Sequence, residues 1–251
     1  MIHFVGAGPG AEDLITVRGE NLLKQADVVI YAGSLVNPAH LKRTKSGCEI
    51  YDSASMTLEQ VMDVMIPAAQ AGKTVVRLHT GDPSIYGAIR EQMDLLDTAQ
   101  IAYDVCPGVS SFCGAAAALH AEYTLPDVSQ TVILSRMAGR TPVPERESIR
   151  SLAVHGSTMV LFLSAGMLGK LSAELIAGGY APETPAAIVY KATWPDEKII
   201  RTTIAELEQA AKQNQITKTA LITVGGFLGD TYERSKLYDP AFTHGCREAS
   251  R

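Results

Sequence analysis

Cysteines and long apolar runs are scarce in this sequence, and their scarcity excludes whole classes of protein. The four cysteines, Cys48, Cys106, Cys113 and Cys246, show no Cys-x-x-Cys spacing and no histidine placed as a zinc partner. We therefore expect reduced thiols and no metal site. Apolar runs such as Met159–Leu163 are far shorter than the roughly 20 residues that a membrane span requires. Since the first residues also lack a basic leader, we expect a cytoplasmic protein that does not enter membranes.

An excess of positive charge is also missing, because the formal net charge is −5. Binding to nucleic acid requires a strongly basic surface, so we do not expect nucleic acid as a partner. Two basic islands, His40–Lys45 and Arg136–Arg150, stand out against this background. Taken alone, each is more typical of a solvated surface than of a binding site.

Strand-like and helix-like segments alternate along the first half of the chain. The periodicity is clearest in Met56–Ala71, where apolar residues recur at spacings of three and four, as in an amphipathic helix. The other segments expected here are strands at Ile2–Gly6, Val28–Tyr31, Thr74–His79 and Ala102–Val105, and helices at Ser84–Leu96 and Ser110–Leu119. This alternation favours an α/β domain with a mostly parallel sheet.

The pattern pauses at Ala121–Gln130 and then resumes, which predicts a boundary between residues 122 and 123. In the second half, Ala186–Tyr190 and Lys198–Thr202 are neighbouring strands that suggest a hairpin. The sequence thus predicts two α/β domains, 1–122 with a mostly parallel sheet and 123–251 with a mixed sheet, and an active site in the cleft between them. The residues after Gly229 form a polar tail, in which we expect one or two docked aromatic side chains from Tyr232, Tyr238 and Phe242.

Three glycine-containing loops each follow a predicted strand. They are Gly6–Gly10, Thr80–Pro83 and Pro107–Ser111. Because a parallel sheet gathers such loops at one edge, a single small polar ligand would explain all three together. Each loop also has a purely structural explanation, as a tight turn or as the cap of the next helix.

The first loop formally fits a dinucleotide-binding fingerprint, but two features count against nicotinamide cofactors. The second strand ends at Tyr31 without the acidic residue that holds ribose hydroxyls. Pro9 also lacks the backbone N–H that a pyrophosphate group would require.

These three loops resemble those of the tetrapyrrole methyltransferase family. Within that family, Tyr31–Val36, Arg140–Pro144 and Tyr190–Pro195 are similar to the precorrin-4 or cobalt-precorrin-4 C11-methyltransferases. The resemblance runs from about residue 4 to residue 242, and it implies a homodimeric two-domain enzyme of cobalamin synthesis that uses S-adenosylmethionine. Its expected activity is methylation of C11 of precorrin-4, with a corrinoid small molecule as substrate.

Position by position, the resemblance implies a set of residues that contact the cofactor and a set that contact the macrocycle. The cofactor set is Pro9, Thr80, Gly81, Asp82, Ile85, Tyr86, Ser110, Ser111, Leu163 and Ala192. Because the macrocycle carries several carboxylates, Ser34, Arg136, Arg140 and Lys191 form the candidate substrate set. The sequence singles out no catalytic base, since His79 and His120 are each more typical of structural histidines.

Three other functions stay open at this point. A nicotinamide oxidoreductase and a non-catalytic corrinoid- or nucleotide-binding module share the glycine loops. A methyltransferase for another ring carbon, or for the cobalt-containing macrocycle, shares the cofactor motifs as well. One departure bears on the substrate: Ala32–Ser34 stands where uroporphyrinogen methyltransferases carry an aspartate, which favours a later step of the corrin pathway.

Overall fold

The computed structural model describes residues 1–250 and divides into two compact units. The first unit contains Met1–Ala115 together with Lys191–Glu197, and the second contains Ala116–Tyr190 and the chain from Lys198 onward. The domain boundary between residues 122 and 123 stays a prediction.

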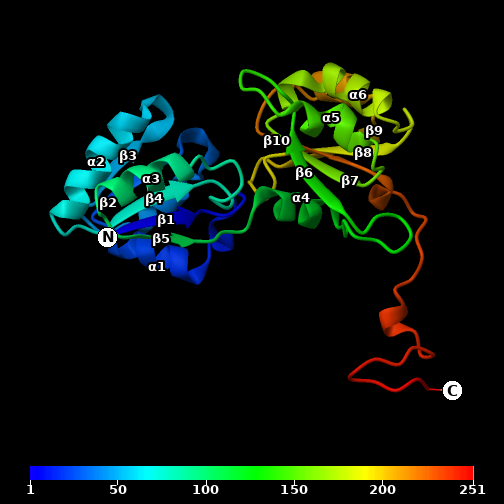
Figure 1. The fold of residues 1–251 in the computed structure, drawn as a ribbon, viewed down its shortest axis with the longest axis horizontal. Helices are drawn as coiled ribbons and strands as arrows, with labels where there is room; N and C mark the ends of the chain where they lie inside the picture. The colour runs from blue at the N-terminus through cyan, green and yellow to red at the C-terminus, as the bar shows by residue number, and fades with distance from the viewer. Residues whose placement is uncertain (251) are drawn as a thin grey trace. The chain divides into compact units, whose positions relative to one another are not determined.

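The first unit is built on a five-stranded sheet in the order β3-β2-β4-β1-β5 (Figure 1). Every pair of neighbouring strands in it is parallel. The strands are β1 Ile2–Gly6, β2 Val28–Tyr31, β3 Glu49–Asp52, β4 Val75–His79 and β5 Tyr103–Cys106. The strand β3 was not predicted, because charged residues stand at both of its ends and it lies at the edge of the sheet.

Helices cover both faces of this sheet, which is why its central strands β1 and β4 are buried along their whole length (Figure 1). The helix α1, Val17–Gln25, packs on one face, and α2, Leu58–Gln70, and α3, Arg90–Thr98, pack on the other. A capping box formed by Thr57 and Gln60 fixes the start of α2.

The start predicted for α3 at Ser84 is wrong, because the helix begins only at Arg90. Tyr86 and Ala88 have positive φ angles of 56° and 50°, which a right-handed helix cannot contain. Asp82 and Ser84 bind each other and the neighbouring backbone, so this segment is a folded loop.

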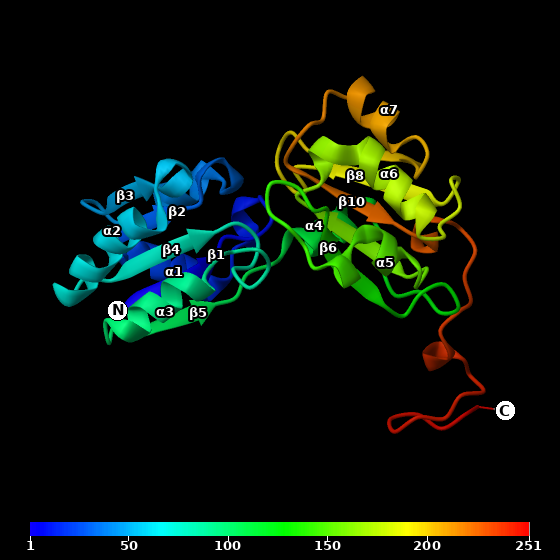
Figure 2. The same cartoon turned by 45° about the horizontal axis from the view of Figure 1, so that its top comes forward.

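The second unit contains a mixed sheet in the order β6-β7-β10-β8-β9, as predicted. Its strands are β6 Val132–Arg136, β7 Thr158–Phe162, β8 Pro185–Tyr190, β9 Lys198–Thr203 and β10 Ala220–Val224. The predicted hairpin is present, since β8 and β9 pair antiparallel. The helices α5 Ile149–Ala153, α6 Leu168–Ala177 and α7 Leu207–Gln213 share one hydrophobic core with the sheet (Figure 2).

The residues after Gly229 leave this unit as a largely irregular segment (Figure 1). The prediction of docked aromatics is wrong, because Tyr232, Tyr238 and Phe242 are all exposed. Only short turns and local hydrogen bonds shape this segment, so no core is available to receive the rings.

Two buried histidines in the first unit make its stability depend on pH. His40 is fully buried, and neither ring nitrogen has a hydrogen-bond partner among residues 1–250. Burial, followed by the charge of Arg43, lowers the pKa of His40. Burial, followed by the charge of Arg77, lowers the pKa of His79 from 6.5 to about 3.

Because the unfolded chain binds these protons more readily, stability is fully present above about pH 6.5 and is lost as the pH falls. We expect each histidine to lower the free energy of unfolding by up to about 1.4 kcal/mol for every pH unit below pH 6.5. In His40→Leu, the free energy of unfolding should fall less between about pH 7.5 and about pH 5 than it does in the unmodified protein, as measured by urea unfolding at both pH values. His155→Gln, at an exposed position, is the control, and an unchanged slope in His40→Leu would contradict the assignment.

Candidate functional site

The three glycine loops follow β1, β4 and β5 at the carboxyl edge of the first sheet. From β1 the chain crosses toward one edge of the sheet to reach β2, and from β4 it crosses toward the opposite edge to reach β5. The helices that make these two crossings, α1 and α3, lie on opposite faces of the sheet. Neighbouring strands whose connections cross to opposite faces mark a topological switch point, where ligands bind in many open α/β sheets.

The three predicted glycine loops meet at this edge through their backbones. Gly8 and Gly81 exchange two hydrogen bonds, with N–H to O distances of 3.2 and 2.8 Å. A Cβ atom on Gly6 would lie 2.6 Å from the Cα of Gly108 and 2.6 Å from the carbonyl oxygen of Gly81. Only glycine allows this approach, so these residues bring the loops together.

Asp82 fastens the second loop to the third. One carboxylate oxygen accepts a hydrogen bond from the N–H of Gly108 at 2.8 Å, and the other accepts bonds from the N–H and hydroxyl of Ser84. Burial raises the pKa of Asp82, but these hydrogen bonds outweigh burial and leave the pKa below its ordinary value. Asp82 therefore holds two loops in register as an anion and does not cap α3.

A fourth segment, the 191–197 loop, packs on the first glycine loop within the same unit. The hydroxyl of Thr193 accepts a hydrogen bond from the N–H of Ala11 at 3.0 Å, and the indole N–H of Trp194 donates to the carbonyl of Pro9 at 3.1 Å. A Cβ atom on Gly10 would lie 2.0 Å from the Trp194 ring, so glycine is required there. The 191–197 loop thus fixes the conformation of residues 9–11.

Nine of the ten residues predicted to contact the cofactor lie in the first unit, at or beside these loops. They are Pro9, Thr80, Gly81, Asp82, Ile85, Tyr86, Ser110, Ser111 and Ala192. Leu163 lies in the second unit, directly after β7, with 65% of its surface exposed. Tyr86 and Leu163 both have positive φ angles, a conformation that concentrates at functional sites.

The four predicted substrate residues differ in how their polar groups are used. The guanidinium of Arg136 donates to the carbonyls of Met137, Thr141 and Pro142, so it supports the loop that carries Arg140. Arg140 itself is exposed and has no hydrogen-bond or ion-pair partner among residues 1–250. Its charge is therefore free to meet a ligand.

Lys191 and Ser34 complete this set. The Lys191 ammonium group binds Asp196 at 2.6 Å and lies 5.1 Å from the centre of the Trp194 ring. Ser34 is exposed in the 3₁₀ turn Gly33–Leu35 that follows β2, at the same sheet edge as the glycine loops.

Thr193, Trp194 and Gly114 were not among the predicted site residues, although Thr193 and Trp194 lie in the family-like motif Tyr190–Pro195. A Cβ atom on Gly114 would lie 2.8 Å from the Cβ of Pro9 and 3.3 Å from the Cγ2 of Thr193. Two features of the sequence could have pointed to these residues: a glycine within the helix α4, Ser111–Leu119, and the only tryptophan in the chain. Neither indicates by itself which loop it contacts. No group of His, Cys, Asp and Glu suited to a metal ion occurs between residues 1 and 250.

Comparison with known proteins identifies the family that uses this arrangement. The family model for Tetrapyrrole (Corrin/Porphyrin) Methylases matches residues 1–208. The chain belongs to the tetrapyrrole methylase family. A cobalt-precorrin-4 C(11)-methyltransferase of Methanocaldococcus jannaschii is 54% identical over 100% of this chain and 97% of its own length. A precorrin-4 C(11)-methyltransferase of Mycobacterium tuberculosis is 44% identical over 97% of this chain and 98% of its own.

Solved structures of this methylase family share the fold. A cobalt precorrin-4 methyltransferase of cobalamin biosynthesis matches with a TM-score of 0.89 and 50% identity, over 91% of this chain and 96% of that one. A uroporphyrin-III C-methyltransferase from Thermus thermophilus, solved with S-adenosylhomocysteine, matches with a TM-score of 0.75 and 25% identity, over 90% and 92% of the two chains.

The contact between Thr193 and Ala11 predicts an effect on cofactor binding in this methylase. Thr193→Val keeps the side-chain shape but leaves the N–H of Ala11 without its acceptor. The lost hydrogen bond is worth about 1 kcal/mol of stabilisation of the first glycine loop. We expect the dissociation constant for S-adenosylhomocysteine, measured by isothermal titration, to rise about fivefold. Thr193→Ser retains the hydroxyl and should bind as the unmodified protein does. Equal affinity of the valine variant would refute this role of the 191–197 loop.

Proposed function

We propose that this chain transfers a methyl group from S-adenosylmethionine to C11 of precorrin-4, giving precorrin-5 in cobalamin biosynthesis. The observation that carries this proposal is identity of 41–54% over nearly the whole chain to six different enzymes, all of them precorrin-4 or cobalt-precorrin-4 C(11)-methyltransferases. The missing aspartate after β2 agrees with it, since Ala32–Ser34 occupies that position.

The sheet edge of the first unit has the chemistry that S-adenosylmethionine requires. Gly8 and Gly81 join the first two loops through paired backbone hydrogen bonds, and the hydroxyls of Thr80, Ser110 and Ser111 lie on the loops beside them. These residues, with Pro9, Asp82, Ile85, Tyr86, Leu163 and Ala192, form the proposed cofactor set. When bound, S-adenosylmethionine supplies a methyl group that its positive sulfonium centre already activates.

The work left to the protein is positioning. The reacting atoms must be held about 3–3.5 Å apart and in line, and such positioning can lower the activation free energy by roughly 7–11 kcal/mol. The backbone contacts of Gly6, Gly81 and Gly108 and the Asp82 bonds make the loops rigid enough for this task. A strong acid for the leaving group is not required, because the leaving group is a neutral thioether.

Recognition of the macrocycle falls to exposed polar groups. We assign its carboxylates to Arg140 first, because its planar guanidinium is unpaired and matches a carboxylate with two parallel hydrogen bonds. Arg136 acts through the loop carbonyls that it holds, and Ser34 and Lys191 complete the set.

The cobalt-containing macrocycle is the second candidate substrate. The relatives that are 54% and 51% identical, from Methanocaldococcus jannaschii and Priestia megaterium, are cobalt-precorrin-4 C(11)-methyltransferases, whereas the precorrin-4 enzyme of Mycobacterium tuberculosis is 44% identical. The metal would arrive inside the macrocycle, as part of the substrate.

We also propose a cytoplasmic homodimer that does not bind nucleic acid. The family resemblance supports the dimer, and the net charge of −5 disfavours nucleic acid. None of the helices between residues 1 and 250 combines the length and apolar character needed to cross a bilayer.

A single-turnover assay tests the reaction itself. Incubation with methyl-labelled S-adenosylmethionine and precorrin-4, with and without cobalt, should place the label on C11 in the NMR spectrum. The macrocycle that reacts faster identifies the preferred metal state. Label on another ring carbon would refute the position of methylation, and absence of transfer to either macrocycle would refute the reaction.

The unpaired charge of Arg140 predicts a selective defect. Arg140→Ala should raise the KM for the macrocycle about tenfold, the equivalent of one charge-assisted hydrogen bond, with cofactor affinity unchanged. Lys170→Ala, which removes an exposed charge from α6 in the same unit, is the matched control. Loss of cofactor binding by a folded Arg140→Ala protein would contradict the assignment.

A further inference from the structure

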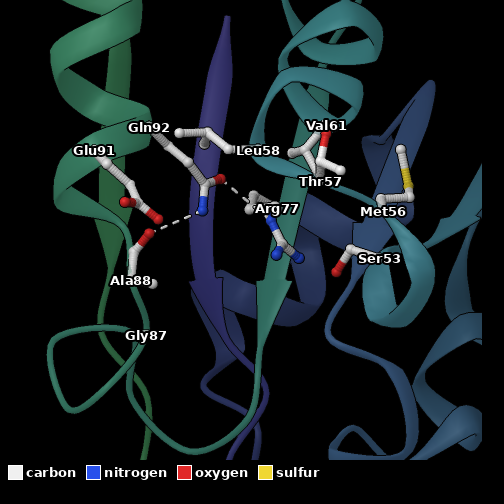
Figure 3. A pocket seen from close by; sticks show the side chains of 10 residues that line it. All are labelled: Ser53, Met56, Thr57, Leu58, Val61, Arg77, Gly87, Ala88, Glu91 and Gln92. Atoms are coloured by element: carbon white, nitrogen blue, oxygen red, sulfur yellow. Dashed lines mark hydrogen bonds between the residues drawn. The ribbon is translucent and has the colours of Figure 1, made fainter. Parts of the chain in front are cut away.

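A cavity of about 170 Å³ lies in the first unit on the face covered by α2 and α3 (Figure 3). Its walls come from the turn at Ser53, the first turns of α2 and the segment 87–92. Met56, Leu58 and Val61 supply an apolar side, and Arg77 from β4 supplies a charge.

Arg77 is a buried cation without a counter-ion. Only 7% of its surface is exposed, yet it forms no ion pair with any carboxylate of residues 1–250. Nη1 donates to the carbonyl of Ile30 at 3.1 Å, and Nε donates to the side-chain oxygen of Gln92 at 3.3 Å. Both acceptors are neutral, and Nη2 has no partner in the part of the chain described.

Such an arrangement is unfavourable unless an anion completes it. Buried charges in proteins are normally paired, because an isolated one loses its hydration without compensation. Burial lowers the pKa of Arg77 to about 10, which reflects this loss and still leaves the group charged at neutral pH. The same cavity meets the N-terminus of α2, a helix of 13 residues whose dipole adds positive potential there.

We propose that this cavity binds the carboxylate of a short aliphatic chain, with the Arg77 guanidinium as its partner. The guanidinium fork matches a carboxylate, and the apolar wall of Met56, Leu58 and Val61 suits an alkyl stem. Glu91 also lines the space but is exposed, and Figure 3 shows its carboxylate beside Ala88, with Gln92 between it and the guanidinium. A second negative group so near disfavours a multiply charged phosphate.

The carboxylate has two possible sources. One is a free short-chain acid, and the other is a carboxylate arm of the methyl acceptor, which rests on the proposed function. Arg77→Met removes the cation but also two internal hydrogen bonds, so it risks misfolding. Ala88→Leu fills the cavity from its exposed rim and leaves the bonds of Arg77 intact.

Thermal unfolding with sodium propionate, against sodium chloride at the same ionic strength, tests the first source. A free acid is supported if propionate raises the Tm of the unmodified protein to a plateau, and if Ala88→Leu needs at least tenfold more propionate for the same rise. Ala117→Leu, at an exposed position elsewhere, should respond as the unmodified protein does.

Methyl-transfer kinetics test the second source. A carboxylate arm of the macrocycle is the ligand if two results are found. Ala88→Leu raises the KM for the macrocycle about tenfold with unchanged cofactor affinity, and esterification of the macrocycle's carboxylates removes the difference in KM between the variant and the unmodified protein. If neither propionate nor the macrocycle distinguishes Ala88→Leu, the carboxylate site is refuted. If no methyl transfer occurs at all, the proposed function fails, and the propionate titration alone decides the cavity.

Discussion

The close approach of three glycine backbones is the constraint on which the candidate site depends. Gly6, Gly81 and Gly108 lie so near one another that a single methyl group on any of them would overlap a neighbouring backbone atom or press closely against one. This proximity lets Asp82 reach across from one loop to the next and hold both with short hydrogen bonds. The ends of β1, β4 and β5 thereby become one rigid surface made largely of backbone. A cofactor that needs positioning more than acid–base chemistry suits such a surface.

The polar side chains of the candidate site residues and of the 191–197 loop fall into two groups, according to whether another part of the protein binds them. Asp82, Arg136, Lys191 and Thr193 are already engaged with other parts of the protein. Arg140 has no such engagement among the described residues. Under the proposed function, the unpaired charge of Arg140 is what a protein of net charge −5 offers to a polycarboxylate substrate.

Regular patterns along the chain were sufficient to predict most strands and helices. The apolar strands β1, β2 and β4 and the amphipathic α2 lie within a few residues of their predicted positions, since burial on both faces or on one stripe marks the sequence directly. The errors fall where local pattern and tertiary contact disagree. The helix predicted from Ser84 starts six residues late, because Asp82, Ser84 and the positive φ angles of Tyr86 and Ala88 form a loop there. The edge strand β3 has only two hydrophobic residues between two charged ones, which is too short a pattern to be recognised.

The sequence by itself determined the fold class, the three glycine loops and the family, because these depend on residues that are neighbours along the chain. Tertiary structure decided how the side chains are used. The indole of Trp194 donates to the carbonyl of Pro9, 185 positions away in the sequence. Arg77 is buried beside a cavity, and no carboxylate of residues 1–250 pairs with it. No spacing rule encodes such contacts, since they arise only when the sheet brings distant segments together, and the resulting burial and pairing set the chemistry of each charge.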